Sequence, residues 1–433
     1  MNEVTIGIVG LFLLLALFMT GIELGFAMAI AGFIGFSIIV SFESALNLLA
    51  TDIFETFSSY GLTVIPLFVL MGQVAFNAGI AKRLYGMAYK FIGGVPGGLA
   101  IATVMGATAF KAICGSSPAT AATFASVAVP EMDQYSYSRK LSTGVVAIVG
   151  TLGILLPPSV TLIILGLVTE QSIGTLFLAG LVPGLIIALS YIVIIIVWCK
   201  INPSLGPKGS PFEWKEKVAS LPEGVWPIII FLIIISGLLK GIFTPTEAGS
   251  IGTFAVLILC FLKRDLDLKG YWKSVQESLR TASMIFVILA GSTIMGHFIA
   301  VTKIPLLAAD WISGLPINRY IIMAMIIIIY EIGGSFIDDL AFMILATPVF
   351  FPTIKKLGFD PIWFCILIGV TVMIGVVIPP VASNVFVVKN ITKESISVIY
   401  KGALPFMISL IACTILLFLF PQITLFLPSL FMK

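Results

Sequence analysis

Long runs of apolar residues, separated by short polar segments, cover most of the chain. A helix needs about 20 apolar residues to cross the hydrocarbon core of a bilayer, and the runs long enough to do so predict ten membrane-spanning helices. Their approximate ranges are 4–20, 24–41, 61–78, 141–169, 175–199, 226–239, 248–262, 283–300, 361–389 and 402–429. The pattern therefore predicts an all-α polytopic membrane protein.

Two further apolar stretches, 97–130 and 320–353, are interrupted midway by small and polar residues. Gly115-Ser116-Ser117-Pro118 interrupts the first, and Gly333-Gly334-Ser335 followed by Asp338-Asp339 interrupts the second. We interpret both as re-entrant hairpins, in which two short helices meet at a tip inside the membrane. Non-helical backbone at that depth persists only where protein or a water-filled cavity satisfies its polar groups.

Two Pro-Pro pairs interrupt the apolar spans 141–169 and 361–389. Proline has no N–H and clashes with the preceding turn, so each span is predicted to be a broken helix. The surrounding segments 153–159 and 375–381 are similar, and the pairs lie 222 residues apart. Each half then contains three spans, a lateral connector, a hairpin and two spans, and the halves begin on opposite sides. A single Pro-Pro pair is readily explained as a kink in a structural helix. Two pairs at matching places of inverted halves are better explained by two broken helices.

Composition and charge agree with this layout. The 433 residues are 59% hydrophobic and only 10% charged, which excludes an ordinary soluble enzyme and a disordered chain. Of the 24 Lys and Arg, 17 lie in segments predicted to be cytoplasmic and 6 in outer segments when the N-terminus is outside, as the positive-inside rule requires. Five cysteines without a CxxC motif and one histidine predict neither a disulfide framework nor a metal cluster.

Several motifs resemble a known family across nearly the whole chain. They are Gly115 to Thr123 with Pro130-Glu131-Met132, Gly153 to Ser159 with its continuation through 172–180, Thr244 to Ala248, and Gly375 to Val381. These residues are similar to the large permease (M) subunit of tripartite ATP-independent periplasmic (TRAP) transporters, the DctM-like family of the ion-transporter superfamily. Lys111 and Asp338-Asp339 depart from the family pattern, which places a small residue at the first position and an Asp with Pro at the second.

The resemblance implies a function and partners. A periplasmic binding protein would deliver an organic acid, such as sialic acid or a C4-dicarboxylate, to a small membrane subunit and this large subunit in the bacterial inner membrane. Transport would be driven by Na⁺ and would use an elevator motion of a transport domain against a scaffold. No nucleic acid is implied, and the chain is not expected to be an enzyme.

The expected division of the chain follows the repeat. Residues 1–96 would form scaffold helices and the arm of the first repeat, and 97–180 its transport region. Residues 181–319 would form the second set of scaffold helices, with a cytoplasmic linker at 200–225 and an arm, and 320–390 the second transport region. Residues 391–433 would form a C-terminal helix.

Two Na⁺ sites are expected where the tips face the broken helices, since unwound carbonyls and hydroxyls are the oxygen ligands that such cations take. The first site comprises Ser116, Ser117, Thr151 and Gly153. The second comprises Gly333, Gly334, Ser335, Thr371, Gly375 and a carboxylate from Asp338 or Asp339. As alternatives, the serines of the first tip cap its second helix, and Asp338 or Asp339 pairs with Lys111.

The substrate is expected between the tips and the Pro-Pro breaks. The candidates are Pro158, Ser159, Thr161, Pro380, Ser383 and Asn384. Asn384 is preferred because an amide both donates and accepts, and its alternative role is an N-cap of the following half-helix. His297 is expected to be a buried packing residue rather than a proton relay.

Three rival functions remain open. A proton-coupled carrier would use Asp338 or Asp339. An intramembrane enzyme would need a nucleophile–base pair or a metal cluster, which one histidine and the absence of an HExxH motif disfavour. An ion channel fits two broken helices in inverted halves less well than alternating access does.

Overall fold

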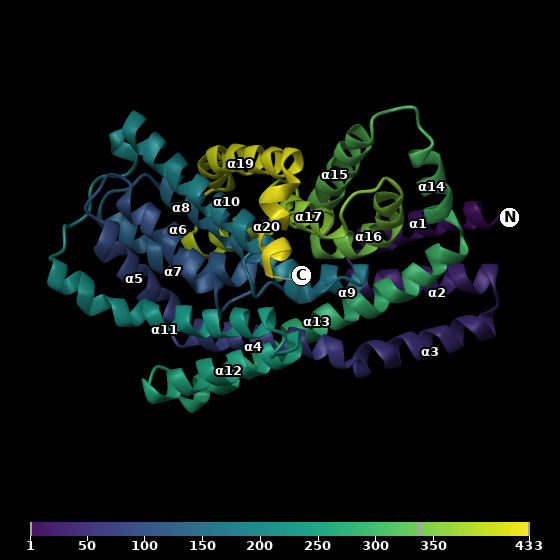
Figure 1. Cartoon of the computed structure of the whole chain (residues 1–433), viewed down its shortest axis with the longest axis horizontal. Helices are drawn as coiled ribbons and strands as arrows, with labels where there is room; N and C mark the ends of the chain where they lie inside the picture. The colour runs from purple at the N-terminus through teal and green to yellow at the C-terminus, as the bar shows by residue number, and fades with distance from the viewer. Residues whose placement is uncertain (1, 337–338, 432–433) are drawn as a thin grey trace.

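The computed structural model describes residues 2–336 and 339–431, and every regular element in these ranges is a helix (Figure 1). The first half contains α1 (Glu3–Met19), α2 (Leu24–Ile39), α3 (Phe42–Ser58), the 3-10 turn η1 (Tyr60–Thr63), α4 (Val64–Asn77), α5 (Ile80–Ile92), α6 (Gly98–Lys111), α7 (Ser117–Gln134), α8 (Arg139–Val149), η2 (Gly150–Ile154), α9 (Val160–Thr169) and α10 (Ile173–Ile201).

The second half repeats this order. It contains η3 (Pro203–Leu205), α11 (Trp214–Leu239), α12 (Pro245–Leu262), α13 (Leu268–Val301), α14 (Ile304–Ser313), α15 (Arg319–Phe336), α16 (Asp339–Lys356), α17 (Pro361–Gly375), α18 (Ser383–Thr392), α19 (Ile396–Leu419) and α20 (Pro421–Phe431). Within the described ranges, seven helical segments are long and apolar enough to cross a membrane, namely η1 with α4, α10, α11, α12, α13, α15 and α19. The prediction of an all-α polytopic membrane protein is confirmed.

The predicted interruptions are present. In the first half α8 ends at Val149 and α9 begins at Val160, and in the second half α17 ends at Gly375 and α18 begins at Ser383. The Pro-Pro pair lies in the non-helical segment in both cases, as the missing N–H groups require. The two hairpins are α6 with α7 and α15 with α16. Gly115 and Ser116 lie outside the helices as predicted, but Gly333-Gly334-Ser335 do not interrupt the second hairpin, because they form the last turn of α15.

Several predicted boundaries are wrong. Segment 42–60, which no predicted span includes, is largely the helix α3, whose N-cap Ser41 accepts a hydrogen bond from the Ser44 N–H at 3.1 Å. The spans predicted from 226 and 283 begin earlier, at Trp214 and Leu268, because polar caps extend both helices beyond their apolar parts. The C-terminal span 402–429 is two helices, since α19 ends before Pro421.

Glycines allow helices from the two halves to pack closely. A Cβ on Gly291 of α13 would overlap the carbonyl oxygen of Gly25 on α2, and a Cβ on Gly144 of α8 would overlap Gly402 of α19. Small residues serve this purpose where helices cross inside a membrane. The crossing of α2 with α13 and that of α8 with α19 therefore hold the two halves of the chain together.

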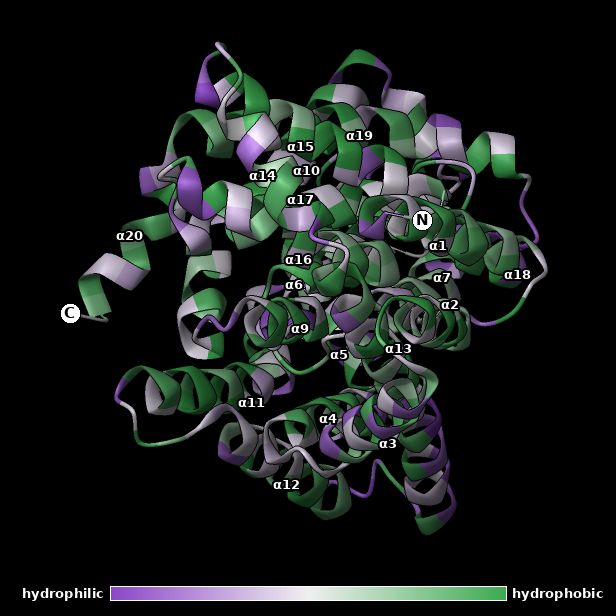
Figure 2. Ribbon diagram, turned by 90° about the vertical axis from the view of Figure 1, so that its right-hand side faces the viewer, coloured by the Kyte–Doolittle hydropathy of each residue, from purple (hydrophilic) through white to green (hydrophobic). Residues whose placement is uncertain are grey.

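The helices form two sides in both views. Helices α3, α4, α11 and α12 lie on one side, and α10, α15, α17 and α19 on the other (Figures 1 and 2). The ribbon is hydrophobic along most helices, with polar residues gathered toward the connections (Figure 2). Large apolar side chains such as Phe12, Leu189 and Ile408 are exposed on the surface, as expected of helices that face lipid.

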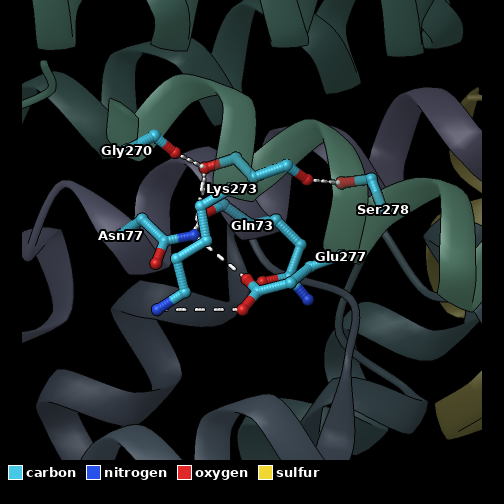
Figure 3. A network of polar contacts seen from close by, with 7 residues as sticks. Gln73, Asn77, Gly270, Lys273, Glu277 and Ser278 are labelled. Carbon is cyan, nitrogen blue, oxygen red and sulfur yellow. Dashed lines mark hydrogen bonds and ion pairs between the residues drawn. The ribbon is translucent and has the colours of Figure 1, made fainter. Parts of the chain in front are cut away.

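A polar network joins α4 to α13 within the first of these sides. The Asn77 amide donates to Ser274 Oγ at 3.0 Å and to Glu277 Oε2 at 3.2 Å, and Lys273 lies 3.8 Å from the same carboxylate (Figure 3). Ser274 in turn donates to the Gly270 carbonyl at 2.9 Å. These bonds connect the third span of each half, both of which belong to the expected scaffold.

Candidate functional site

Each hairpin tip contacts the Pro-Pro break of its own half. A Cβ on Gly115 would lie 2.5 Å from the carbonyl oxygen of Pro158, so only glycine allows the first tip to approach this closely. In the second half the Val381 N–H donates to the Ser335 carbonyl at 3.3 Å. The structure thus brings together the tip and break residues that the repeat predicts to be neighbours.

Asn384 connects the second break to the first tip. Its side chain is fully buried, and its amide nitrogen donates to Ser117 Oγ at 3.0 Å and to the Ala147 carbonyl at 3.2 Å. A Cβ on Gly150 would lie 2.8 Å from this nitrogen, so a glycine there leaves room for the amide. The alternative role of Asn384 as an N-cap is wrong, because Ala382 occupies that position of α18.

Lys111 lies among the residues of the expected first cation site. Its side chain is 0% exposed, and its ammonium donates to the Ser116 carbonyl at 2.8 Å. A Cβ on Gly153 would lie 2.6 Å from Lys111 Cε and would overlap Nζ. The alternative pairing with Asp338 or Asp339 stays a prediction, because Asp338 and the side chain of Asp339 lie outside the described part of the structure.

The hydroxyls of the expected cation sites are engaged locally. Ser116 caps α7 by accepting from the Ala119 N–H at 3.3 Å, so the capping alternative is confirmed for this serine. Thr151 donates to the Ile148 carbonyl at 2.7 Å, and Thr371 donates to the Leu367 carbonyl at 3.0 Å. A hydroxyl that gives its hydrogen to a carbonyl keeps oxygen lone pairs for another ligand.

The second tip contains a buried carboxylate oxygen without a partner. Ser335 donates to the Glu331 carbonyl at 2.7 Å, and Oε1 of Glu331 is buried and makes no hydrogen bond in the described part of the chain. Gly334 and Gly375 are buried, and Gly333 allows the Phe342 ring to lie against the backbone. Asp338 lies outside the described residues.

The substrate candidates differ in exposure between the halves. Pro158, Ser159 and Thr161 are buried, and Ser159 caps α9 while donating to the Ile154 carbonyl at 2.5 Å. Pro380 is exposed and Ser383 is partly exposed. Of the six candidates, only these two residues of the second break are open in this conformation.

Two polar residues that the sequence interpretation missed lie beside the first tip. Gln73 of α4 and Thr281 of α13 line a cavity of about 20 Å³ together with Gly115 and Ser116. The polar position of Gln73 inside the predicted span 61–78 was a signal that could have identified it, whereas Thr281 lies just before the predicted span 283–300 and no such signal marks it. The prediction that His297 is a buried packing residue is wrong. Its side chain is 48% exposed, and its Nδ1 lies 2.9 Å from Asp52 Oδ2.

Known proteins resemble the chain in both sequence and fold. A family model described as "Tripartite ATP-independent periplasmic transporter, DctM component" matches residues 11–423. A C4-dicarboxylate TRAP transporter large permease of Pseudomonas aeruginosa is 34% identical over 91% of this chain and 92% of its own length. A sialic acid TRAP transporter large permease of Vibrio cholerae is 30% identical over 96% of this chain and 97% of its own length.

A solved structure shares the fold alone. The YdaH transporter of Alcanivorax borkumensis superposes with a TM-score of 0.61 at 12% identity, covering 88% of this chain and 89% of that one. The family match over nearly the whole length identifies a multi-pass inner-membrane transporter subunit, not an enzyme. The chain belongs to the family of large permease subunits of tripartite ATP-independent periplasmic transporters.

Proposed function

We propose that this chain imports an organic acid by Na⁺-coupled elevator transport, after a periplasmic binding protein delivers the acid to it and to a small membrane subunit. The observation that carries the proposal is the bond between Asn384 and Ser117 at 3.0 Å. It joins the broken helix of one half to the hairpin tip of the other, as expected where two interrupted segments build one shared site.

Na⁺ coupling is supported at the second tip by its chemistry. The carbonyls of Gly333, Gly334 and Gly375, with the hydroxyls of Ser335 and Thr371, offer the oxygen ligands that a hard cation takes. The unpartnered Oε1 of Glu331, one turn before Ser335, adds a buried carboxyl oxygen. A bound Na⁺ would supply positive charge beside an anionic substrate and would link substrate entry to the Na⁺ gradient.

This chain is proposed to recognise the carboxylate of its substrate. The two relatives described above are named for C4-dicarboxylates and for sialic acid, which share this group. Ser383 begins α18, where the positive end of the helix dipole favours an anion. The Ser383 hydroxyl and the Pro380 backbone lie at the accessible break.

The proposal is tested in proteoliposomes that contain this chain with its small subunit, supplied with the binding protein. The acid is first identified by the thermal stabilisation that succinate, malate, N-acetylneuraminate and other acids give the binding protein. An inward Na⁺ gradient should then drive uptake, and an equal K⁺ gradient should not. Uptake that ignores Na⁺ contradicts the coupling.

Proton coupling is the second candidate, and the buried carboxylate of Glu331 favours it. The same vesicles distinguish the two mechanisms. An inward proton gradient without Na⁺ should leave uptake at the background level if Na⁺ is the coupling ion. Accumulation under these conditions that is lost in Glu331→Gln would establish the proton-coupled carrier instead.

A further inference from the structure

The first tip of this chain contains its own cation. The ammonium of Lys111 donates to the Ser116 carbonyl at 2.8 Å and lies against the backbone of Gly153. These are two of the four residues expected to bind the first Na⁺, one from the tip and one from the facing broken helix. The lysine nitrogen therefore lies between the two elements that a bound Na⁺ would bridge.

A backbone oxygen, that of Ser116, accepts a hydrogen bond from the Lys111 ammonium. The residue is the last of α6, where unpaired carbonyls and the negative end of the helix dipole favour a positive group. None of the ion pairs between the described side chains, which do not include those of Asp338 and Asp339, involves Lys111. Carbonyl oxygens stabilise this ammonium in the way that they stabilise an alkali cation.

The residues of the first site therefore do not fit a Na⁺. The Ser116 carbonyl already accepts from Lys111 Nζ at 2.8 Å and from Thr120 Oγ1 at 3.0 Å. A Na⁺ on this oxygen would lie beside the ammonium, and two like charges at that distance in a buried site repel strongly.

The second tip differs at the matching position. Lys111 precedes Gly115 by four residues, and Ile329 precedes Gly333 by four residues. The Ile329 side chain is apolar and 41% exposed. Glu331 then follows, with its buried oxygen unpartnered within the described residues. The second tip thus has a carboxyl group where the first has an ammonium, although the two belong to a repeat.

We infer that the Lys111 ammonium takes the place of one of two Na⁺ ions, so that each chain binds a single Na⁺ at the second tip. This inference rests on the proposed Na⁺ coupling.

Two variants separate the two effects of the lysine, its charge and its volume. Lys111→Ala removes both and opens the first site to Na⁺, whereas Lys111→Met removes the charge and keeps most of the volume.

The test counts Na⁺ bound by the purified complex of this chain with its small subunit, using ²²Na⁺ alone and choline to hold the ionic strength. Wild type should bind one Na⁺ per chain, Lys111→Ala two, and Lys111→Met one. A second measurement is the rise of the unfolding temperature with the logarithm of Na⁺ concentration. Each site adds its own stabilisation, so the slope should be about twice as steep for Lys111→Ala.

The outcomes separate this inference from the proposed function. Two Na⁺ per wild-type chain, or one Na⁺ on both wild type and Lys111→Ala, overturns the role of Lys111 while Na⁺ coupling stands. No Na⁺ on wild type and one on Lys111→Ala supports the role of Lys111 and removes the proposed site at the second tip. No Na⁺ on any variant removes both. If Lys111→Ala does not fold, the wild-type count decides: one Na⁺ supports the inference and two overturn it.

Discussion

A single amide, that of Asn384, ties the two halves of the chain together at their interrupted segments. It donates to a hydroxyl on the first tip and to the carbonyl of Ala147 on α8. All of these groups are buried or nearly so, and a buried polar group that loses its partner keeps the full cost of its desolvation. The bond to Ser117 is therefore expected to contribute to stability as well as to the shape of the site.

Asn384→Ala should destabilise the complex by about 1–3 kcal/mol, because the Ala147 carbonyl and the Ser117 hydroxyl lose a partner. The change is measured by unfolding in detergent. Ser117→Ala provides the second arm of a double-mutant cycle, and the double variant should be less destabilised than the sum of the single variants. Strict additivity would show that the two side chains do not interact.

At the scale of the helices, close crossings between glycines decide how the halves pack. Gly291 of α13 meets the backbone of Gly25 on α2, whereas a Cβ on Gly296 of the same helix would have no atom of the described residues within 4 Å. The backbone cannot yield as the end of a flexible side chain can. Two glycines five residues apart in α13 thus differ in whether they tolerate a larger side chain.

Gly291→Val should lower the unfolding temperature and the yield of the folded complex, because its side chain would force α13 away from α2. Gly296→Val, with the same change of propensity in the same helix, is the matched control and should remain close to wild type. Equal losses in the two variants would mean that helix propensity, rather than the crossing, sets the effect.

For the whole molecule, the proposed motion requires the tips to move past the scaffold. One pair of positions in the described structure allows this motion to be tested. Gly72 on α4 belongs to the expected scaffold, and a Cβ there would lie 3.6 Å from Cβ of the native Cys114 beside the first tip. Disulfides join Cβ atoms at about 3.5–4.5 Å, so one added cysteine can link the two regions.

Gly72→Cys should form a disulfide with Cys114 under mild oxidation, and uptake by proteoliposomes should stop until a reductant is added. Gly72→Cys combined with Cys114→Ser controls for oxidation elsewhere and should keep its uptake. Full cross-linking with unchanged uptake would contradict a motion of the tip against α4.

Much of the architecture was predictable because its causes are local. The length of an apolar run determines whether it can span a bilayer, and a Pro-Pro pair interrupts a helix whatever surrounds it. The site was less predictable. Sequence reasoning selected Asn384 for its chemistry but did not foresee its bond to Ser117. It treated Lys111 as a departure from a family pattern or as an ion-pair partner of Asp338 or Asp339, not as a neighbour of Gly153.

The sequence by itself therefore determined an all-helical membrane protein with two hairpins and two broken helices in a repeated order. Only the tertiary structure decided that Lys111 meets Gly153, that Asn384 reaches the opposite tip, and that the second break is exposed while the first is sealed. These contacts join residues far apart along the chain. Their distances depend on how helices from both halves cross, which no local pattern of residues specifies.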